Sequence, residues 1–466
     1  MSRNHPLDGI YKNRIRFPAC GTPPFGSLGI AVTAPICGGK INTPKGKKGI
    51  EKMAKAEVKI PLGIPDVRVL KTEINDRGEV IITIESTKEG TRCRRCGKWI
   101  TKSHGVDEWV QVRHLPVFGR PTYLRYQPRR YRCTHCEKKP TTTEELDWHG
   151  KGSSKTLEYE DHILLQLVHS TVEDVSIKEQ MSYDEVLGVM ERRVVSAVNW
   201  SQYKGIYRLG LDEIALKKGH RDFVTIVTGR LENDRIVLLG VLPGRKKETV
   251  IEFLRSIPMR LVATIEEVCC DMYEGYTEAV REELPKAKIV IDRFHVTRHY
   301  SKAADKLRQR ELKRLKKELS VEEYQQLKGH MWAFRKKPED LSKEEHQILQ
   351  TLFRKAPQVK VAYRLREKLT GIFEERLSKS DAKRKFRAWI RQVRRSDLTC
   401  FDDFIHTLEN WLEEIANFFI HRDSSGFVEG FNNKIKVLKR RCYGIFNIQH
   451  LFQRIFLDLE GYRLYA

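Results

Sequence analysis

The segment from Tyr207 to Val296 constrains the fold most, because short apolar runs alternate in it with amphipathic stretches. Three strand-like runs come first, and a turn over residues 229–235 separates the second from the third. A helical stretch, a fourth strand, a second helix and a fifth strand follow. The runs are YRLGLDEIAL, DFVTIVTGR, RIVLLGVLPG, ETVIEFLRSIP, TIEEVCCDM, YTEAVREEL and AKIVIDRFHV. This order predicts an α/β sheet covered by helices.

Length and charge indicate the size of the protein and the kind of partner it binds. The chain has 466 residues, which exceeds one ordinary domain. It carries 86 Lys and Arg against 62 Asp and Glu, a net charge of +24. Such an excess favours a polyanion, because basic side chains release the counterions held by phosphates. No apolar run is long enough to span a bilayer and none is typical of an export signal. An anionic membrane surface is the alternative polyanion, but nucleic acid is favoured, so we expect DNA and no membrane partner.

We expect a multidomain α/β protein with six segments. The first, residues 1–52, is rich in Gly, Pro and Lys, so we predict a mostly disordered leader, and Met53 is a candidate natural start. A β-rich zinc-binding module over 53–150 and a helix-turn-helix DNA-binding domain over 151–203 come next. The first part of the sheet core then covers 204–298. An all-helical insertion over 299–420 precedes the closing core helices over 421–466.

Local signals support the two modules that precede the core. Alternation from Val67 to Glu85 around the sequence NDRG predicts a β-hairpin. Helical periodicity begins near Leu157, and a break before Ser182 leads into a further helix, with Glu185 placed to complete a capping box. Two short helices around a tight turn fit a helix-turn-helix, and a plain helical hairpin fits equally well.

Four of the ten cysteines form two CxxC pairs that flank a β-rich stretch: Cys93, Cys96, Cys133 and Cys136. Each pair turns the chain sharply enough for two thiolates to face one ion, and nearby Arg and Lys favour the thiolate form. A redox CxxC is the alternative, but two copies around a β segment suit a closed structural Zn²⁺ site far better. The other cysteines are scattered, which indicates a reduced, cytoplasmic protein.

Three acidic residues are candidates for a catalytic metal site. Asp212 ends the first predicted strand of the core, Asp271 ends the fourth, and Glu429 begins a late helix. Two close carboxylates repel unless a cation joins them, so a divalent metal site, with three carboxylates holding two hard cations, is the natural use. Such ions activate a water or 3′-hydroxyl and stabilise the leaving oxygen of a phosphodiester.

Structural roles compete with this interpretation. Asp212 could be a turn residue, Asp271 a helix N-cap, and Glu429 an ordinary first-turn charge. Asp292, after the fifth predicted strand, is a rival third ligand or a helix N-cap. His295 follows it and is a possible accessory group, although satisfied structural histidines are the commoner case.

The helix after Glu429 carries amide and basic groups that we predict to lie along a DNA backbone, a solvated charged face being the alternative. These residues are Asn432, Asn433, Lys436, Lys439 and Arg440. The stretch from Arg376 to Arg395 is also basic and could contact phosphate, whereas its aromatic residues Phe386 and Trp389 fit a core better.

The order of these motifs resembles the ISL-three group of bacterial insertion-sequence transposases, within the DDE class. The likeness covers roughly residues 65 to 460. It rests on the opening IPDVRV, the CxxC pairs, the helix-turn-helix, GLDEIAL, CCDMYEGY, IDRFHV and SSGFVEGFNNKIKVLKRRCYG. The Pro/Gly/Lys-rich leader has no counterpart in the family pattern.

The resemblance implies a ribonuclease H-like mixed sheet core in which Asp212, Asp271 and Glu429 are the first, second and third catalytic acids. It also implies an Mg²⁺-dependent enzyme that binds terminal inverted repeats, cleaves DNA and joins the 3′-hydroxyl ends to target DNA. We expect a homo-oligomer on double-stranded DNA, associated with the nucleoid. A catalytically silent DNA-binding protein derived from a transposase, and a ribonuclease H-like nuclease without strand transfer, are the alternatives.

Overall fold

The computed structural model describes residues 61–216, 223–327, 329–422 and 426–466, with the backbone alone at 426–429. The chain divides into two compact units, Met1–Leu62 and Gly63–Ala466. The predicted disordered leader and the candidate start at Met53 lie outside the described residues. All that follows concerns the second unit.

The first part of this unit is β-rich, as predicted, and the hairpin at its start is confirmed. The side-chain oxygen of Asn75 closes the hairpin by accepting hydrogen bonds from the N–H groups of Arg77 and Glu79. The strands are β1 (Val67–Ile74), β2 (Val80–Ser86), β3 (Thr91–Arg92), β4 (Trp99–Ile100), β5 (Ser103–Val106), β6 (Val110–Val117), β7 (Arg120–Tyr126), β8 (Arg129–Arg132) and β9 (Thr141–Thr143). They form sheets of order β1-β2-β7-β6, β3-β4 and β5-β8-β9. Pro128, which lacks an N–H, separates the two consecutive strands β7 and β8.

Three helices follow: α1 (Leu157–Leu167), α2 (Val172–Glu179) and α3 (Tyr183–Arg193). The predicted capping box is present at the start of α3, where Ser182 and Glu185 cap each other's backbone N–H. The apolar side chains of α1, α2 and α3 share a core with Leu457 of the last helix, α16 (Ile448–Tyr465). A 3-10 turn, η1 (Trp200–Gln202), leads from these helices to the central sheet.

The central sheet has five strands in the order β12-β11-β10-β13-β14. The first three are antiparallel neighbours, whereas β10, β13 and β14 run parallel. This is the ribonuclease H-like order that was predicted. The strands are β10 (Arg208–Ala215), β11 (Phe223–Arg230), β12 (Ile236–Pro243), β13 (Glu267–Cys270) and β14 (Lys288–Ile291). The last strand is shorter than expected, because Asp292 accepts a hydrogen bond of 2.9 Å from the Phe294 N–H and starts a helix.

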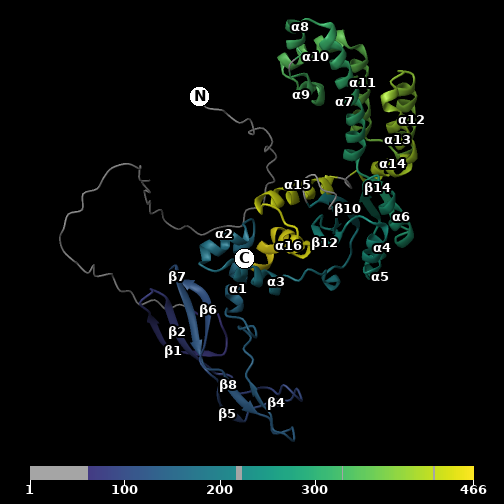
Figure 1. The fold of residues 1–466 in the computed structure, drawn as a ribbon. Helices are drawn as coiled ribbons and strands as arrows, with labels where there is room; N and C mark the ends of the chain where they lie inside the picture. Colours follow the sequence, from purple (N-terminus) through teal and green to yellow (C-terminus); the bar gives the residue numbers. More distant parts are fainter. Residues whose placement is uncertain (1–60, 217–222, 328, 423–425) are drawn as a thin grey trace, which may run out of the picture. The chain divides into compact units, whose positions relative to one another are not determined.

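Helices cover both faces of this sheet (Figure 1). Leu209 and Leu211 of β10 point into the core shared with α4 (Lys247–Arg255), α5 (Met259–Val262) and α6 (Glu274–Glu283). Ile214 points to the other face, with α15 (Gly426–Arg441) and α16. Alternate residues of one strand therefore stabilise two separate cores.

The region between β14 and α15 is all-helical in its described part, as predicted. It comprises α7 (Arg293–Glu318), α8 (Val321–Gln325), α9 (His330–Arg335), η2 (Pro338–Asp340), α10 (Lys343–Lys355), α11 (Pro357–Glu374), α12 (Lys379–Arg394), η3 (Thr399–Phe401), α13 (Asp402–Asn410) and α14 (Leu412–His421). Phe386 and Trp389 of α12 are buried in the core, as expected. Among the described residues, no helix combines the length and apolar character needed to cross a bilayer.

Candidate functional site

The register of the central sheet brings Asp212 and Asp271 together. Leu211 of β10 pairs with Cys270 of β13, so the next residue on each of these parallel strands is an aspartate. The sequence suggested that Asp212 ends its strand, and this is wrong. Asp212 lies inside β10, because β10 continues to pair with β11 through Asp212 and Ile226. The parallel pairing of β10 with β13 ends after Leu211 and Cys270. The two carboxylates meet in the space that opens between the strands there.

A histidine joins the two carboxylates. One ligand atom each from Asp212, Asp271 and His295 lies within 4.8 Å of the others. His295 belongs to the first turn of α7, and its Nε2 lies 2.9 Å from Oδ1 of Asp271. Asp292, the rival third ligand, is the N-cap of this helix and is buried.

Burial and mutual repulsion determine the charge of this cluster. Asp212 is 9% exposed, and its burial, followed by the negative charge of Asp271, raises the pKa of its carboxyl group to about 7. Burial lowers the pKa of His295, but the hydrogen bond to Asp271 and the nearby carboxylates outweigh this, so the net shift is upward. The metal-free cluster therefore holds protons that a divalent cation would replace.

Asn432 of α15 completes the surroundings of Asp212. Its side chain is 7% exposed, and its Nδ2 donates a hydrogen bond to Oδ2 of Asp212. Its Oδ1 is buried and has no hydrogen-bond partner among the described residues. Two carboxylates, an imidazole and a free amide oxygen form a donor set that suits a hard divalent cation.

The predicted DNA-binding residues of α15 divide between two faces of the helix. Asn432 and Lys439, seven residues apart, face the sheet, and the Lys439 ammonium donates to the carbonyl oxygen of Ala215. Asn433, Lys436 and Arg440 are exposed. A step of one residue turns a helix by about 100°, so neighbouring asparagines serve different faces.

The third predicted acid, Glu429, lies in the first turn of α15, three residues before Asn432. Its side chain falls outside the described residues. Its convergence with Asp212 and Asp271 therefore stays a prediction.

The four cysteines predicted to bind zinc lie together. Their sulfur atoms are all within 4.8 Å of one another, with 3.7 Å between Cys96 and Cys133. Cys93 and Cys96 sit in the turn between β3 and β4, and Cys133 and Cys136 follow β8. The Cys133 thiol accepts the N–H of His135 at 3.4 Å, one of several backbone groups that turn toward sulfur.

The pKa values of two thiols in this cluster are shifted in opposite directions. Hydrogen bonds from the N–H groups of Cys96 and Arg95 lower the pKa of Cys93 to about 6. Desolvation, followed by hydrogen bonds with the other three cysteines, raises that of Cys136 to about 12. Four thiolates so close together need a cation to coexist, and tetrahedral Zn²⁺ with four sulfur ligands meets this need.

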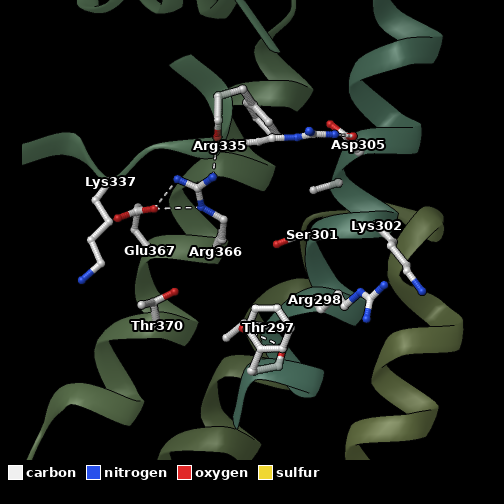
Figure 2. A pocket seen from close by; sticks show the side chains of 13 residues that line it. Thr297, Arg298, Ser301, Lys302, Asp305, Arg335, Lys337, Arg366, Glu367 and Thr370 are labelled. Atoms are coloured by element: carbon white, nitrogen blue, oxygen red, sulfur yellow. Dashed lines mark hydrogen bonds and ion pairs between the residues drawn. The ribbon is translucent and has the colours of Figure 1, made fainter. Parts of the chain in front are cut away.

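A cavity of about 580 Å³ lies between α7, α9 and α11, and Phe294, which precedes His295, is among its lining residues. Ser301 of α7 and Thr370 of α11 point into it from opposite sides (Figure 2). Arg366, on its wall, is already bound to Glu367 at 2.6 Å. Arg298 and Lys302, which also line it, have no ion-pair partner in the described part of the chain, so they add positive charge next to the carboxylate cluster.

Sequence reasoning underestimated two residues. His295 was expected only as an accessory group, although its position three residues after a helix-capping Asp292 places it in the first helical turn. Asn432 was assigned to a DNA-facing surface, and only the packing of α15 on β10 shows that it contacts Asp212. Helical periodicity separates it from Asn433, because the apolar residues Phe431, Ile435 and Leu438 place Asn432 beside the buried face and Asn433 on the opposite side.

Comparisons with known proteins agree with this arrangement. Residues 209–455, more than half of the chain, match a family described as the ISL3 transposase of the DDE class. Residues 89–136, which contain the four cysteines, match the zinc-finger of transposase IS204/IS1001/IS1096/IS1165.

Curated relatives extend the likeness over most of the chain. The transposase for insertion sequence element IS1001 of Bordetella parapertussis is 27% identical over 382 residues, covering 82% of this chain and 91% of the relative. The transposase for insertion sequence element IS1557 of Mycobacterium tuberculosis is 24% identical over 425 residues, covering 86% and 93%. Among solved structures, the Drosophila P element transposase strand transfer complex aligns with a TM-score of 0.37 and 12% identity over 66% of this chain and 91% of that chain, which is too weak to bear on function. The chain belongs to the ISL3 family of transposases and is thus a DNA-processing enzyme with a zinc-ribbon sequence before its catalytic domain.

Proposed function

We propose that this transposase binds the terminal inverted repeats of its insertion sequence, cleaves DNA there and joins the 3′-hydroxyl ends to target DNA. The observation that carries the proposal is the meeting of Asp212 and Asp271 beside His295, inside the region that matches the family. Both are proposed catalytic acids, and Glu429 is the third. Residues three apart share a helix face, so a Glu429 carboxylate on the same side as Asn432 would complete the set.

Two Mg²⁺ (or Mn²⁺) ions fit these residues. Asp212, Asp271 and Glu429 would hold them, with His295 and the unpaired Oδ1 of Asn432 as further donors. When bound, such ions activate the attacking hydroxyl and stabilise the leaving oxygen of a phosphodiester.

The chain's own residues orient the two aspartates. The Asn432 amide holds one oxygen of Asp212 and the Glu213 N–H holds the other at 2.6 Å, so this carboxylate cannot rotate freely. His295 fixes Asp271 in the same way. Burial and the charge of Asp271 raise the pKa of Asp212 to about 7, so this carboxyl group ionises near neutral pH. The ionised carboxylate is the form that would bind a metal ion.

DNA would contact the exposed side of α15 and the module before the core. Asn433, Lys436 and Arg440 face outward and have no acidic partner in the described part of the structure, which suits phosphate contacts. The helix α3, with its capped N-terminus, is the proposed recognition helix. We further propose that the four-cysteine cluster holds a structural Zn²⁺ and that the transposase acts as an oligomer on DNA.

The test compares Asp271→Ala with Asp340→Ala, which removes an exposed aspartate of the helical insertion. Asp271→Ala should bind DNA ends with unchanged affinity and show no cleavage in Mg²⁺, whereas Asp340→Ala should cleave normally. Pre-cleaved ends offered with a circular target then separate a transposase from a nuclease that cannot join strands. Undiminished cleavage by Asp271→Ala would remove this residue from the site.

A further inference from the structure

A second cavity, of about 800 Å³, lies between α2, α3 and the connection from α15 to α16. Neither the proposed catalytic centre nor the zinc cluster includes it. Its lining brings together aromatic side chains, three guanidinium groups and two carboxylates. The residues used below are Glu173, Asp174, Arg441, Tyr443, Phe446 and Arg454.

The wall formed by α16 and the end of α15 carries an excess of positive charge. Arg454 is 2% exposed, and its Nε and Nη1 have no hydrogen-bond partner of ordinary geometry among the described residues. Nε of Arg441 is also buried and unpaired. Both guanidinium groups share one carboxylate, Asp458. Buried, unpaired donors on cations are costly, so a ligand that brings an anionic oxygen is favoured here.

Tyr443, at the rim, stands where a glycine is the usual residue. Its N–H bonds to the Arg440 carbonyl at 3.2 Å, and the Gly444 N–H bonds to that of Lys439 at 2.9 Å, which closes α15 with a Schellman motif. The φ of Tyr443 is 52°, in the left-handed region that favours glycine. Tyr443 is 96% exposed, so the fold gains almost nothing from a side chain that strains the backbone. Strain without a structural benefit points to a ligand.

We propose that this cavity binds a nucleoside phosphate, namely a nucleotide of the DNA strand displaced from its duplex. The Tyr443 ring stacks on the base, with Phe446 beside it at the rim, and Arg441 and Arg454 hold the phosphate. Glu173 and Asp174, on the α2 wall, accept hydrogen bonds from amino groups of the base. The cavity volume lies in the range of small-ligand sites.

The position of the cavity links it to the catalytic centre. Asn432, which contacts Asp212, lies on α15, and Tyr443 follows the end of this helix, eleven residues or about 16 Å further along its axis. A DNA strand bound along the exposed basic face of α15 would run from the proposed catalytic centre toward this cavity. This inference rests on the proposed function for its DNA partner, but it does not require catalysis.

The experiment measures DNA binding in EDTA, so that cleavage plays no part. The probes are a duplex with one unpaired 2-aminopurine nucleotide and a fully paired duplex of the same sequence. The intact protein should prefer the unpaired probe by about tenfold, with a change in 2-aminopurine emission. Tyr443→Phe should keep this preference, and Tyr443→Asn should abolish it. Asparagine tolerates a positive φ, so Tyr443→Asn should not lower the melting temperature.

Control variants make the result decisive. Tyr462→Ala, which removes another exposed tyrosine ring, should leave the preference intact. Asp271→Ala should also keep it, so failure of the catalytic proposal leaves this test unaffected. The inference is overturned if the intact protein shows no preference, or if Tyr443→Asn retains it. If a deoxynucleoside monophosphate competes as effectively as the unpaired probe, the ligand of the cavity is a free nucleotide and not a nucleotide of DNA.

Discussion

Replacing Asp212 by Asn should stabilise the metal-free protein at alkaline pH. Burial and Asp271 raise the Asp212 pKa from 3.8 to about 7, so the folded state resists ionisation of this carboxyl group. The stability that the protonated group contributes is full below about pH 4 and is lost as the pH rises through about 7. At about 1.4 kcal/mol for each pKa unit, the loss above pH 7 reaches about 4 kcal/mol, an upper bound. Asparagine has nearly the same shape and does not ionise.

Thermal unfolding in EDTA between pH 4 and pH 8 measures this effect. Because the chain has several parts, the informative quantity is the difference between wild type and Asp212→Asn at each pH. The two should melt together near pH 4, and the variant should melt several degrees higher at pH 8. Excess Mg²⁺ should reverse the order, since it stabilises only the protein with both carboxylates. A difference that does not change with pH would refute the reasoning about Asp212.

Two further outcomes concern the zinc cluster and the helical insertion. Cys133→Ser should lose one equivalent of bound zinc, measured by elemental analysis, and should expose the β3–β9 region to protease; unchanged zinc content would contradict the four-sulfur site. Trp389→Ala should lower the unfolding free energy of the helical insertion by about 3–5 kcal/mol, because this side chain is 3% exposed and its Nε1 donates to the Leu365 carbonyl at 2.9 Å. Denaturant unfolding followed by circular dichroism checks this, and a loss below about 1 kcal/mol would contradict it.

The order of strands and helices could be predicted because it depends on local patterns. The hairpin from Val67, the five core strands and the helical insertion all show the periodicity of their elements, and the structure confirms them. The capping box of Ser182 and Glu185 is likewise a contact between residues three apart. Errors occurred at ends, as in the fifth core strand, which stops at Ile291, whereas the helix N-cap considered for Asp292 is confirmed.

The candidate metal site could be predicted only in part, because it depends on contacts between distant elements. Asp212 and Asp271 were found since strand ends in a sheet of this order converge. The contact of Asn432 with Asp212 depends on how α15 packs on β10, whereas periodicity alone places Asn432 beside the buried face of its helix without identifying its partner. The strained position of Tyr443 is a property of backbone angles, which the letters CYG do not reveal.

The last helix, α16, has a consequence for how accurately this enzyme could place a cut. Gln453 donates to the Val194 carbonyl at 2.7 Å and Arg454 to that of Leu167 at 3.0 Å, while Phe452 packs in the core beneath the central sheet. The helices proposed to read sequence and the sheet that carries Asp212 thus both pack on α16, in addition to being joined along the chain by the segment over 194–207. On the proposed function, the packing of both parts on α16 would fix the number of base pairs between the recognised sequence and the cleaved bond.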